Sequence, residues 1–528
     1  MLKRFVAVGS AALIASALVA QAKPLSSEDF SKYPNVSSVS MSLEGDMLVG
    51  VIADPSKKGE TRAAAYWDIS GKIDTTKPLV PSAITPSSGK TMFFAASALK
   101  DRKSLWFTVQ PYIGALYGCG EGRDTGATKK YLQKAYMGNE MITEIDDLPS
   151  GRAEVGANKD TLRCFELVGE TAIETILPLD PSKIIISRAS TKNGTSYFSH
   201  DLANGREKFL YKASDTQAIA VSSKDGMPVA RTELDYSGGA WRQHISLPDA
   251  DGKFSREDAL STDISNRYTM NVVGRQNGTG KYFVITDKFS DKTSVYLYDA
   301  GANTFSDTAV LAHPEFDITN LIFSQREQDF GELLGFVYDG AQSTTYWLDP
   351  EMKGIQDGLD AAFPGKNVTL SDYTADRNRV LFQVSATNSP PAYYLLVDKS
   401  KVAVIGSERP WISEESLGKG ELVYYPARDG MKIPALITYP AGFKEGDKAK
   451  GAILVPHGGP WARDYAGFDS SGWTQYFASR GYIIMQPQYR GSAGWGRELW
   501  LAGDGEWGQK MQDDKDDGAA WLVSQGYV

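Results

Sequence analysis

Cysteine and histidine are scarce in this chain, with two and four copies among 528 residues. Neither residue recurs at the short spacings of a zinc site, and no glycine-rich phosphate-binding motif occurs, so we expect no metal ion and no cofactor. Basic residues are also in deficit. The formal net charge is −9, which argues against nucleic acid as a partner because phosphate binding requires a basic surface.

Long apolar runs are absent after the N-terminus, so we expect no membrane association once the leader is removed. The N-terminus has the pattern of a secretory signal peptide: Lys3 and Arg4, an apolar stretch over 5–19, and an Ala-Gln-Ala cleavage site at 20–22. A membrane anchor is the alternative, but the stretch is shorter than the ~20 apolar residues that a spanning helix needs. We expect residues 1–22 to be removed and the protein to be secreted or periplasmic.

The two cysteines, Cys119 and Cys164, would meet an oxidising compartment in an exported protein, and they allow one pairing. We expect a disulfide between them. Two buried free thiols are the alternative, because spacing alone does not bring the Cα atoms within ~7 Å. Cys119 belongs to a long insert over 114–160, which we expect to be a solvated surface loop with a helix near 129–137.

Short strands and tight turns dominate the chain from about residue 40 to 405. Pairs of strands recur at intervals of roughly 45–80 residues, near the spacing of propeller blades. The second strand of many pairs ends in an apolar residue and then Asp, as expected if every unit turns at the same radius. We therefore expect residues 23–407 to form a β-propeller of about seven blades, with an irregular β-sandwich as the alternative. The expected pairs are 47–53 with 64–68, 105–110 with 162–167, 184–187 with 196–201, 229–232 with 241–246, 282–286 with 294–299, 333–338 with 345–349, and 380–384 with 393–398.

A different pattern begins at residue 408, where strands alternate with helices as in an α/β sheet. We expect residues 408–528 to form the N-terminal half of an α/β-hydrolase domain. The nucleophile of that fold lies on a G-x-S-x-G turn, and no such motif occurs in the 528 residues. We therefore expect a chain truncated before its nucleophile. The expected elements are a hairpin of 422–425 with 433–438, a strand over 452–455, a helix over 473–480, a strand over 482–486 and a helix ending at 524.

Several short motifs of this half occur in a fixed order, and together they resemble the prolyl oligopeptidase family of serine peptidases, especially its acylaminoacyl-peptidase and bacterial dipeptidyl-peptidase branch. The resemblance implies a peptidase that cleaves short peptides, with a propeller that restricts access to the active site. It leaves the cleavage preference and the oligomeric state open. The motifs are Tyr425-Pro-Ala-Arg-Asp-Gly-Met-Lys-Ile-Pro434, His457-Gly-Gly-Pro460, Tyr489-Arg-Gly-Ser492, Gly494-Trp-Gly496, and Trp507-Gly508 followed by Asp513-Asp514.

The same resemblance implies that the catalytic Ser, Asp and His of the family lie beyond Val528, so we expect no catalytic residue within the chain. It assigns the backbone N–H of Gly458 to the oxyanion hole, with His457 and Gly459 as its neighbours. A general-base role for His457 is rejected, because the base of this fold follows the nucleophile in the chain. We expect His457 to shape its loop instead.

We also expect a supporting loop that contains Arg490, Gly491 and Ser492, with Arg490 paired to a carboxylate. Ser492 lacks the first glycine of a nucleophile turn and is expected to be a turn residue. The aspartates at 513, 514, 516 and 517 are more consistent with a solvated helix N-terminus than with a metal site. The remaining histidines, which lie in the propeller half and are expected to be structural, are His200, His244 and His313.

Three functional hypotheses remain. The first is an exported serine peptidase of this family, present without its Ser, Asp and His and therefore inactive as given. The second is a non-catalytic propeller protein that binds peptides or a partner in the cell envelope. The third is an esterase on the same fold.

Overall fold

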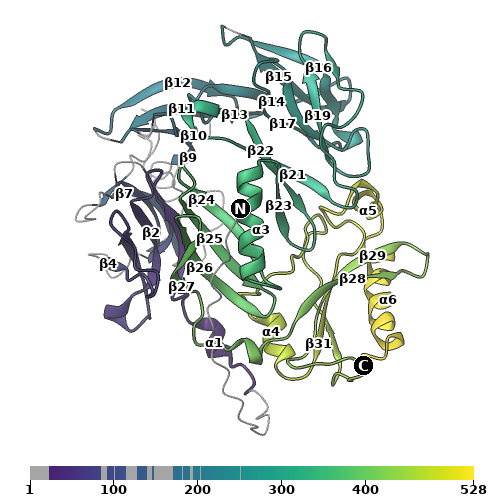
Figure 1. Ribbon diagram of the computed structural model, residues 1–528. Coiled ribbons are helices and arrows are strands. Elements are labelled where there is room, and N and C mark those ends of the chain that lie inside the picture. The colour runs from purple at the N-terminus through teal and green to yellow at the C-terminus, as the bar shows by residue number, and fades with distance from the viewer. Residues whose placement is uncertain are drawn as a thin grey trace.

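A computed structural model describes residues 23–84, 92–99, 102–114, 128–138, 145–147, 171–180, 182–190, 194–202, 204–249 and 251–528. The predicted signal peptide, both cysteines and much of the 114–160 insert lie outside the described residues. The described chain forms seven antiparallel sheets followed by one mixed sheet (Figure 1).

Each antiparallel sheet consists of strands that are consecutive in the chain. The first two sheets contain β1 (Val36–Met41), β2 (Met47–Ala53), β3 (Arg62–Asp68) and β4 (Ser82–Ile84), then β5 (Met92–Ala98), β6 (Ser104–Gly114), β7 (Thr128–Gly138) and β8 (Ile145–Asp147). The third and fourth contain β9 (Thr171–Ile176), β10 (Lys183–Ser190), β11 (Gly194–Asp201) and β12 (Glu207–Ala213), then β13 (Gln217–Val221), β14 (Pro228–Ser237), β15 (Ala240–Pro248) and β16 (Phe254–Asp263). The last three contain β17 (Met270–Arg275), β18 (Tyr282–Thr286), β19 (Ser294–Asp299) and β20 (Thr304–Phe305), then β21 (Asp317–Phe323), β22 (Leu333–Asp339) and β23 (Ser343–Trp347), then β24 (Asn367–Tyr373), β25 (Arg379–Ala386), β26 (Ser389–Val397) and β27 (Lys401–Ser407).

These sheets pack on one another through apolar side chains, as the blades of a β-propeller do. Ile245 of the fourth sheet, for example, shares a buried cluster with Val284 of the fifth. The first sheet also packs on the last, since Trp67 lies in one cluster with Leu395. This arrangement agrees with the predicted propeller.

Six of the seven predicted strand pairs are present, and the second is wrong. Leu105 and its neighbours in β6 pair with β5 and β7, whereas residues 162–167 lie outside the described chain. The helix predicted near 129–137 is the strand β7, which pairs with β6 over all of its 11 residues. Lysine, glutamine, leucine and alanine favour a helix locally, but pairing with a neighbouring strand outweighs that weak preference.

One helix within the propeller was not expected from the sequence. Helix α3 (Pro350–Ala362) begins at Asp349, whose carboxylate accepts the N–H groups of Glu351 and Met352. Its buried residues follow the helical period and pack between the sixth and seventh sheets. The described residues of the propeller half also contain three single 3-10 turns, η1 (Pro55–Lys57), η2 (Ile264–Asn266) and η3 (Glu327–Asp329), and a fourth, η4 (Glu414–Ser416), lies between the propeller and β28.

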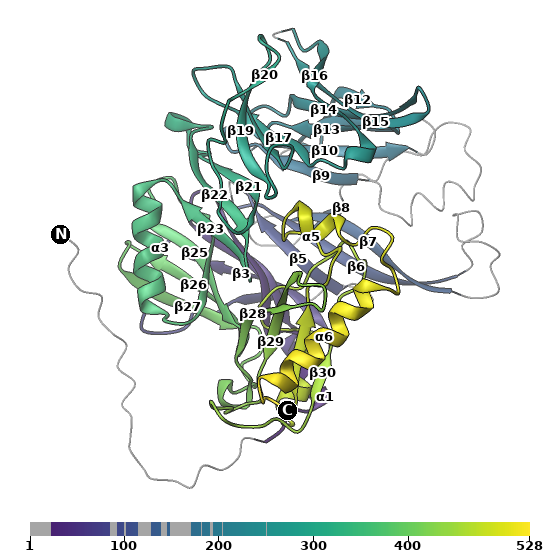
Figure 2. The ribbon, with the colours of Figure 1, turned by 90° about the vertical axis from the view of Figure 1, so that its right-hand side faces the viewer.

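The mixed sheet has the strand order β28-β29-β31-β30, which is the order expected for the first four strands of an α/β-hydrolase. Only β30 and β31 run parallel. Helix α6 covers this sheet, and α5 points toward the propeller (Figure 2). The elements are β28 (Gly420–Pro426), β29 (Lys432–Thr438), β30 (Ala452–Leu454), β31 (Ile483–Pro487), α4 (Trp473–Ala478), α5 (Arg497–Leu501) and α6 (Lys510–Ser524).

The first described segment packs on the hydrolase half. It contains α1 (Ser27–Ser31). Leu25 lies in one apolar cluster with Ile412 and Leu417, and the Arg409 guanidinium donates to the Asp29 carbonyl oxygen at 3.1 Å. Within the described ranges, no helix is both long and apolar enough to span a membrane.

Because the first and last sheets pack on each other through buried side chains, a cavity created between them should lower the stability of the propeller strongly. Leu395 is fully buried there, so Leu395→Ala should cost about 2–5 kcal/mol of stability. The melting temperature of the propeller should therefore fall. Val404→Ala, on the adjoining strand at 39% exposure, is the matched control and should have little effect. Equal melting temperatures for both variants would contradict the packing described.

Candidate active site

The parallel pairing of β30 and β31 brings two loops together. Ala452 is opposite Ile483 and Leu454 is opposite Met485, so the carboxyl ends of both strands lie at one edge of the sheet. The loop after β30 carries His457-Gly-Gly-Pro460. The loop after β31 runs from Gln488 to Gly496. Ligands of α/β sheets bind at this edge.

Three side chains connect the two loops. Nε2 of His457 lies 2.8 Å from the Ser492 hydroxyl oxygen. The imidazole also stacks on the Tyr489 ring at 4.7 Å, and the Tyr489 hydroxyl donates to the His457 carbonyl oxygen at 2.8 Å. These contacts hold the glycine pair that follows His457 in a fixed place relative to the second loop.

The His457–Ser492 contact is not the geometry of an activated nucleophile. Ser492 is fully buried, and its hydroxyl donates to the Tyr489 carbonyl oxygen at 2.6 Å. We therefore assign the ring N–H as the donor to Ser492. Nδ1 lies 3.0 Å from the Gly458 carbonyl oxygen, so both ring nitrogens face oxygen atoms of the protein. His457 shapes the loop, and Ser492 lies in a turn in which its N–H donates to the Tyr489 carbonyl oxygen.

The placement of the catalytic triad beyond Val528 stays a prediction, and the His457–Ser492 pair does not substitute for it. Val528 itself packs, with Tyr527, on the apolar cluster of the mixed sheet that includes Leu522. The Ala449 N–H donates to the Tyr527 carbonyl oxygen at 2.8 Å. The chain is therefore packed on the hydrolase sheet up to Val528.

The two glycines after His457 present backbone donors. Gly458 and Gly459 are exposed, and in the described part of the chain neither N–H has an acceptor. Gly459 has φ +132°, which side-chain-bearing residues rarely adopt. The loop is therefore open to a carbonyl oxygen from outside.

Arg490 is buried and forms ion pairs with two carboxylates. Its guanidinium donates to Asp514 at 2.7 and 2.9 Å and to Asp429 at 3.0 and 3.2 Å. The Arg490 N–H also donates to the Asp514 carboxylate at 2.9 Å. The Arg490 guanidinium lowers the pKa of Asp429 to about 2, and its bonds to Asp514 raise its own pKa. The loop after β31 is thus fixed to α6 and to the hairpin turn of β28 and β29.

This network corrects one interpretation of the sequence. Asp514 does not belong to a solvated helix N-terminus, because it is fully buried against Arg490. Asp513 and Asp517 instead pair with Arg428 nearer the surface. Among the described residues, no group of His, Cys, Asp and Glu is arranged to hold a metal ion.

The propeller holds the other end of the same loop. The Gly496 N–H donates to Asp317 at 2.9 Å. Asp291 accepts the Glu498 N–H at 2.6 Å, at the start of α5, and Lys292 donates to the Trp495 carbonyl oxygen at 2.6 Å. The two halves of the chain therefore share the loop that supports the glycine pair.

Arg463 joins the halves at a third point. Its guanidinium donates to the carbonyl oxygens of Asp339 and Gly494 at 3.1 and 2.9 Å and lies between the rings of Tyr465 and Trp495. Burial lowers the pKa of Arg463. Sequence reasoning missed this residue and the propeller aspartates above, because most of their partners lie more than a hundred residues away and no motif links them.

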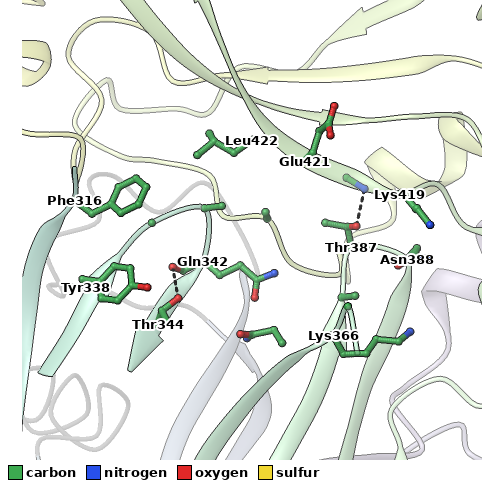
Figure 3. A pocket seen from close by; sticks show the side chains of 17 residues that line it. Phe316, Tyr338, Gln342, Thr344, Lys366, Thr387, Asn388, Lys419, Glu421 and Leu422 are labelled. Carbon is green, nitrogen blue, oxygen red and sulfur yellow. Dashed lines mark hydrogen bonds between the residues drawn. The ribbon is translucent and has the colours of Figure 1, made fainter. Parts of the chain in front are cut away.

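A separate cavity of about 570 Å³ lies where the sixth and seventh sheets meet β28 (Figure 3). Phe316 and Tyr338 line one side and Lys366 the opposite side, while Leu422 lies on β28 between them. None of the residues predicted from the sequence as site residues lines it. The cavity is thus distinct from the glycine loop.

Parts of the chain are similar to known peptidases. The profile described as the prolyl oligopeptidase family matches residues 468–528. Dipeptidyl aminopeptidase BIII of Pseudoxanthomonas mexicana is 29% identical over 343 residues, which are 62% of this chain and 46% of that protein. Dipeptidyl peptidase family member 6 of Caenorhabditis elegans is 31% identical over 183 residues, which are 31% of this chain and 24% of that protein. The chain thus spans less than half the length of either relative.

Solved structures share the fold over nearly the whole chain. A puromycin hydrolase aligns with TM-score 0.56 at 15% identity, covering 95% of this chain and 73% of its own. A Mycobacterium tuberculosis puromycin-hydrolyzing peptidase aligns with TM-score 0.59 at 13% identity, covering 95% of this chain and 74% of its own. The fold is therefore that of a propeller joined to an α/β-hydrolase sheet. The chain is thus similar to the prolyl oligopeptidase family over residues 468–528.

Removal of the Arg490 side chain should loosen the hydrolase half. Arg490→Met leaves Asp514 buried without a counter-charge, a change that costs about 3–5 kcal/mol. Hydrogen exchange should accelerate in α6 and β31 but not in the propeller. Arg428→Met is the control, because the Arg428 side chain is more than half exposed and water screens its pairs with Asp513 and Asp517, so its loss should change exchange little. Equal exchange in both variants would contradict the role of Arg490.

The lowered pKa of Asp429 predicts an acid-sensitive contribution to stability. Its folded pKa of about 2 lies below the usual value for aspartate. The contribution is therefore complete above about pH 4 and is lost as the pH falls from about 4 to about 2. Asp429→Asn should remove this dependence, so the stability difference between wild type and variant should shrink through that window. A difference that stays constant from pH 6 to pH 2 would contradict the assignment.

Proposed function

We propose that the chain forms the propeller and the oxyanion-binding part of an exported serine peptidase that acts on short peptides. The observation that carries the proposal is the pair of N–H groups at Gly458 and Gly459, which have no acceptor among the described residues and are held against the loop after β31. In this proposal a seven-bladed propeller limits access to peptides of small size. The N-terminal pattern of residues 1–22 supports export.

The proposed chemistry assigns one task to each loop. The Gly458 N–H would donate to the carbonyl oxygen of the scissile peptide and stabilise the charge that develops on it, a contribution of about 10²–10³ in rate for a single donor. The loop after β31 would keep that donor in place. The attacking serine would not come from these 528 residues, since they contain no G-x-S-x-G motif and Ser492 is buried and hydrogen-bonded.

A covalent probe and a binding measurement test the proposal together. The purified chain should not react with a fluorophosphonate, because no serine of the described residues has the geometry of a nucleophile. It should bind short peptides reversibly in calorimetry. Stoichiometric labelling of any serine would contradict the first expectation. Absence of peptide binding, or hydrolysis of simple esters, would contradict the second and favour a partner-binding propeller or an esterase.

A further inference from the structure

Two tryptophans beside the glycine loop are in contact and exposed together. Trp461 directly follows the His-Gly-Gly-Pro sequence, and Trp507 lies between α5 and α6. Their ring centroids are 5.9 Å apart at an interplanar angle of 55°. The two residues remain 54% and 61% exposed. They form one aromatic surface from two separate loops, which we call the tryptophan pair.

Gly491 holds the two tryptophan-bearing loops close together. It has φ +98°, and a Cβ at this position would lie 3.2 Å from Pro460 Cβ and 3.0 Å from Met511 Cε. A Cβ at Gly503 would in turn lie 2.7 Å from Gly491 Cα. Because Gly491 and Gly503 have no side chains, the loop before Trp461 and the loop before Trp507 can both pack against Gly491. The pair is positioned before any ligand arrives, which lowers the entropic cost of binding.

The position of the pair indicates what occupies it. Trp461 is separated from Gly459 by one residue, and the N–H groups of the exposed Gly458 and Gly459 have no acceptor among the described residues. A peptide whose carbonyl oxygen accepts from Gly458 would have its neighbouring side chains beside the tryptophans. Tryptophan rings pack favourably on aromatic side chains, and tryptophans are frequent among the residues that dominate binding energy.

We propose that the tryptophan pair is a specificity subsite that binds an aromatic or large apolar side chain of the peptide substrate. This inference rests on the proposed peptide recognition at Gly458. It adds a preference that the glycine loop alone does not supply, because backbone donors recognise every peptide bond alike.

A peptide series measures this preference on the chain itself. The probes are tetra-alanine and four tetrapeptides in which phenylalanine replaces alanine at one position. Calorimetry should show that at least one phenylalanine peptide binds wild type more tightly than tetra-alanine does. Trp461→Ala and Trp507→Ala should each lower the affinity for that peptide by about ten-fold. Neither variant should change the affinity for tetra-alanine.

Trp473→Ala is the matched control. Trp473 is 62% exposed, on α4 and stacked on Phe477, so its loss should alter no peptide affinity. If wild type and both variants bind the phenylalanine peptides equally, the subsite is wrong while peptide recognition stands. If no peptide binds wild type, both are overturned. If wild type is a dimer that either variant converts to a monomer, the pair is an interface between copies and the proposal fails.

Discussion

The buried pair of Arg490 and Asp514 is the interaction on which the hydrolase half depends. Burial of two charges is costly, and only a dense set of hydrogen bonds compensates for it. Here the compensation extends to Asp429 and to the backbone of Arg490 itself. The strand β31, the helix α6 and the first hairpin therefore meet at one point. The loop that faces the glycine pair starts from that point, so the geometry of the candidate site is set by charges beneath it.

Residues from both halves of the chain also hold the candidate site in place. The loop after β31 is held at one end by Arg490 and at the other by Asp317 and Asp291 of the propeller. His457 then connects this loop to the glycine pair. A change in the contact between propeller and hydrolase sheet would therefore reach the glycine pair through these side-chain hydrogen bonds. The propeller in this arrangement helps to hold the loop that supports the site.

Local patterns in the sequence predicted six of the seven strand pairs and the pairing of Arg490 with a carboxylate. They failed where distant partners decide the outcome. The segment around Leu132 has helix-forming residues but pairs with β6. The sequence around Asp514 suggests a surface residue, but the structure shows it paired with Arg490. Helix α3 had a usable signal in Asp349 followed by proline, an N-cap and a favoured first residue. Arg463 had no such sequence signal, because its guanidinium donates to backbone carbonyl oxygens, one of which belongs to Asp339 in the propeller.

The packing of the first sheet on the last imposes an order of assembly. Met41 and Asp372, which bond across this contact, are separated by 331 residues. As the chain emerges from the ribosome, the first sheet is complete long before its neighbour exists, and loop closure over such a distance is slow. The apolar face that contains Trp67 is therefore without its partner for most of synthesis. A chaperone that holds this face would act on the first sheet, before any part of the hydrolase domain has been made.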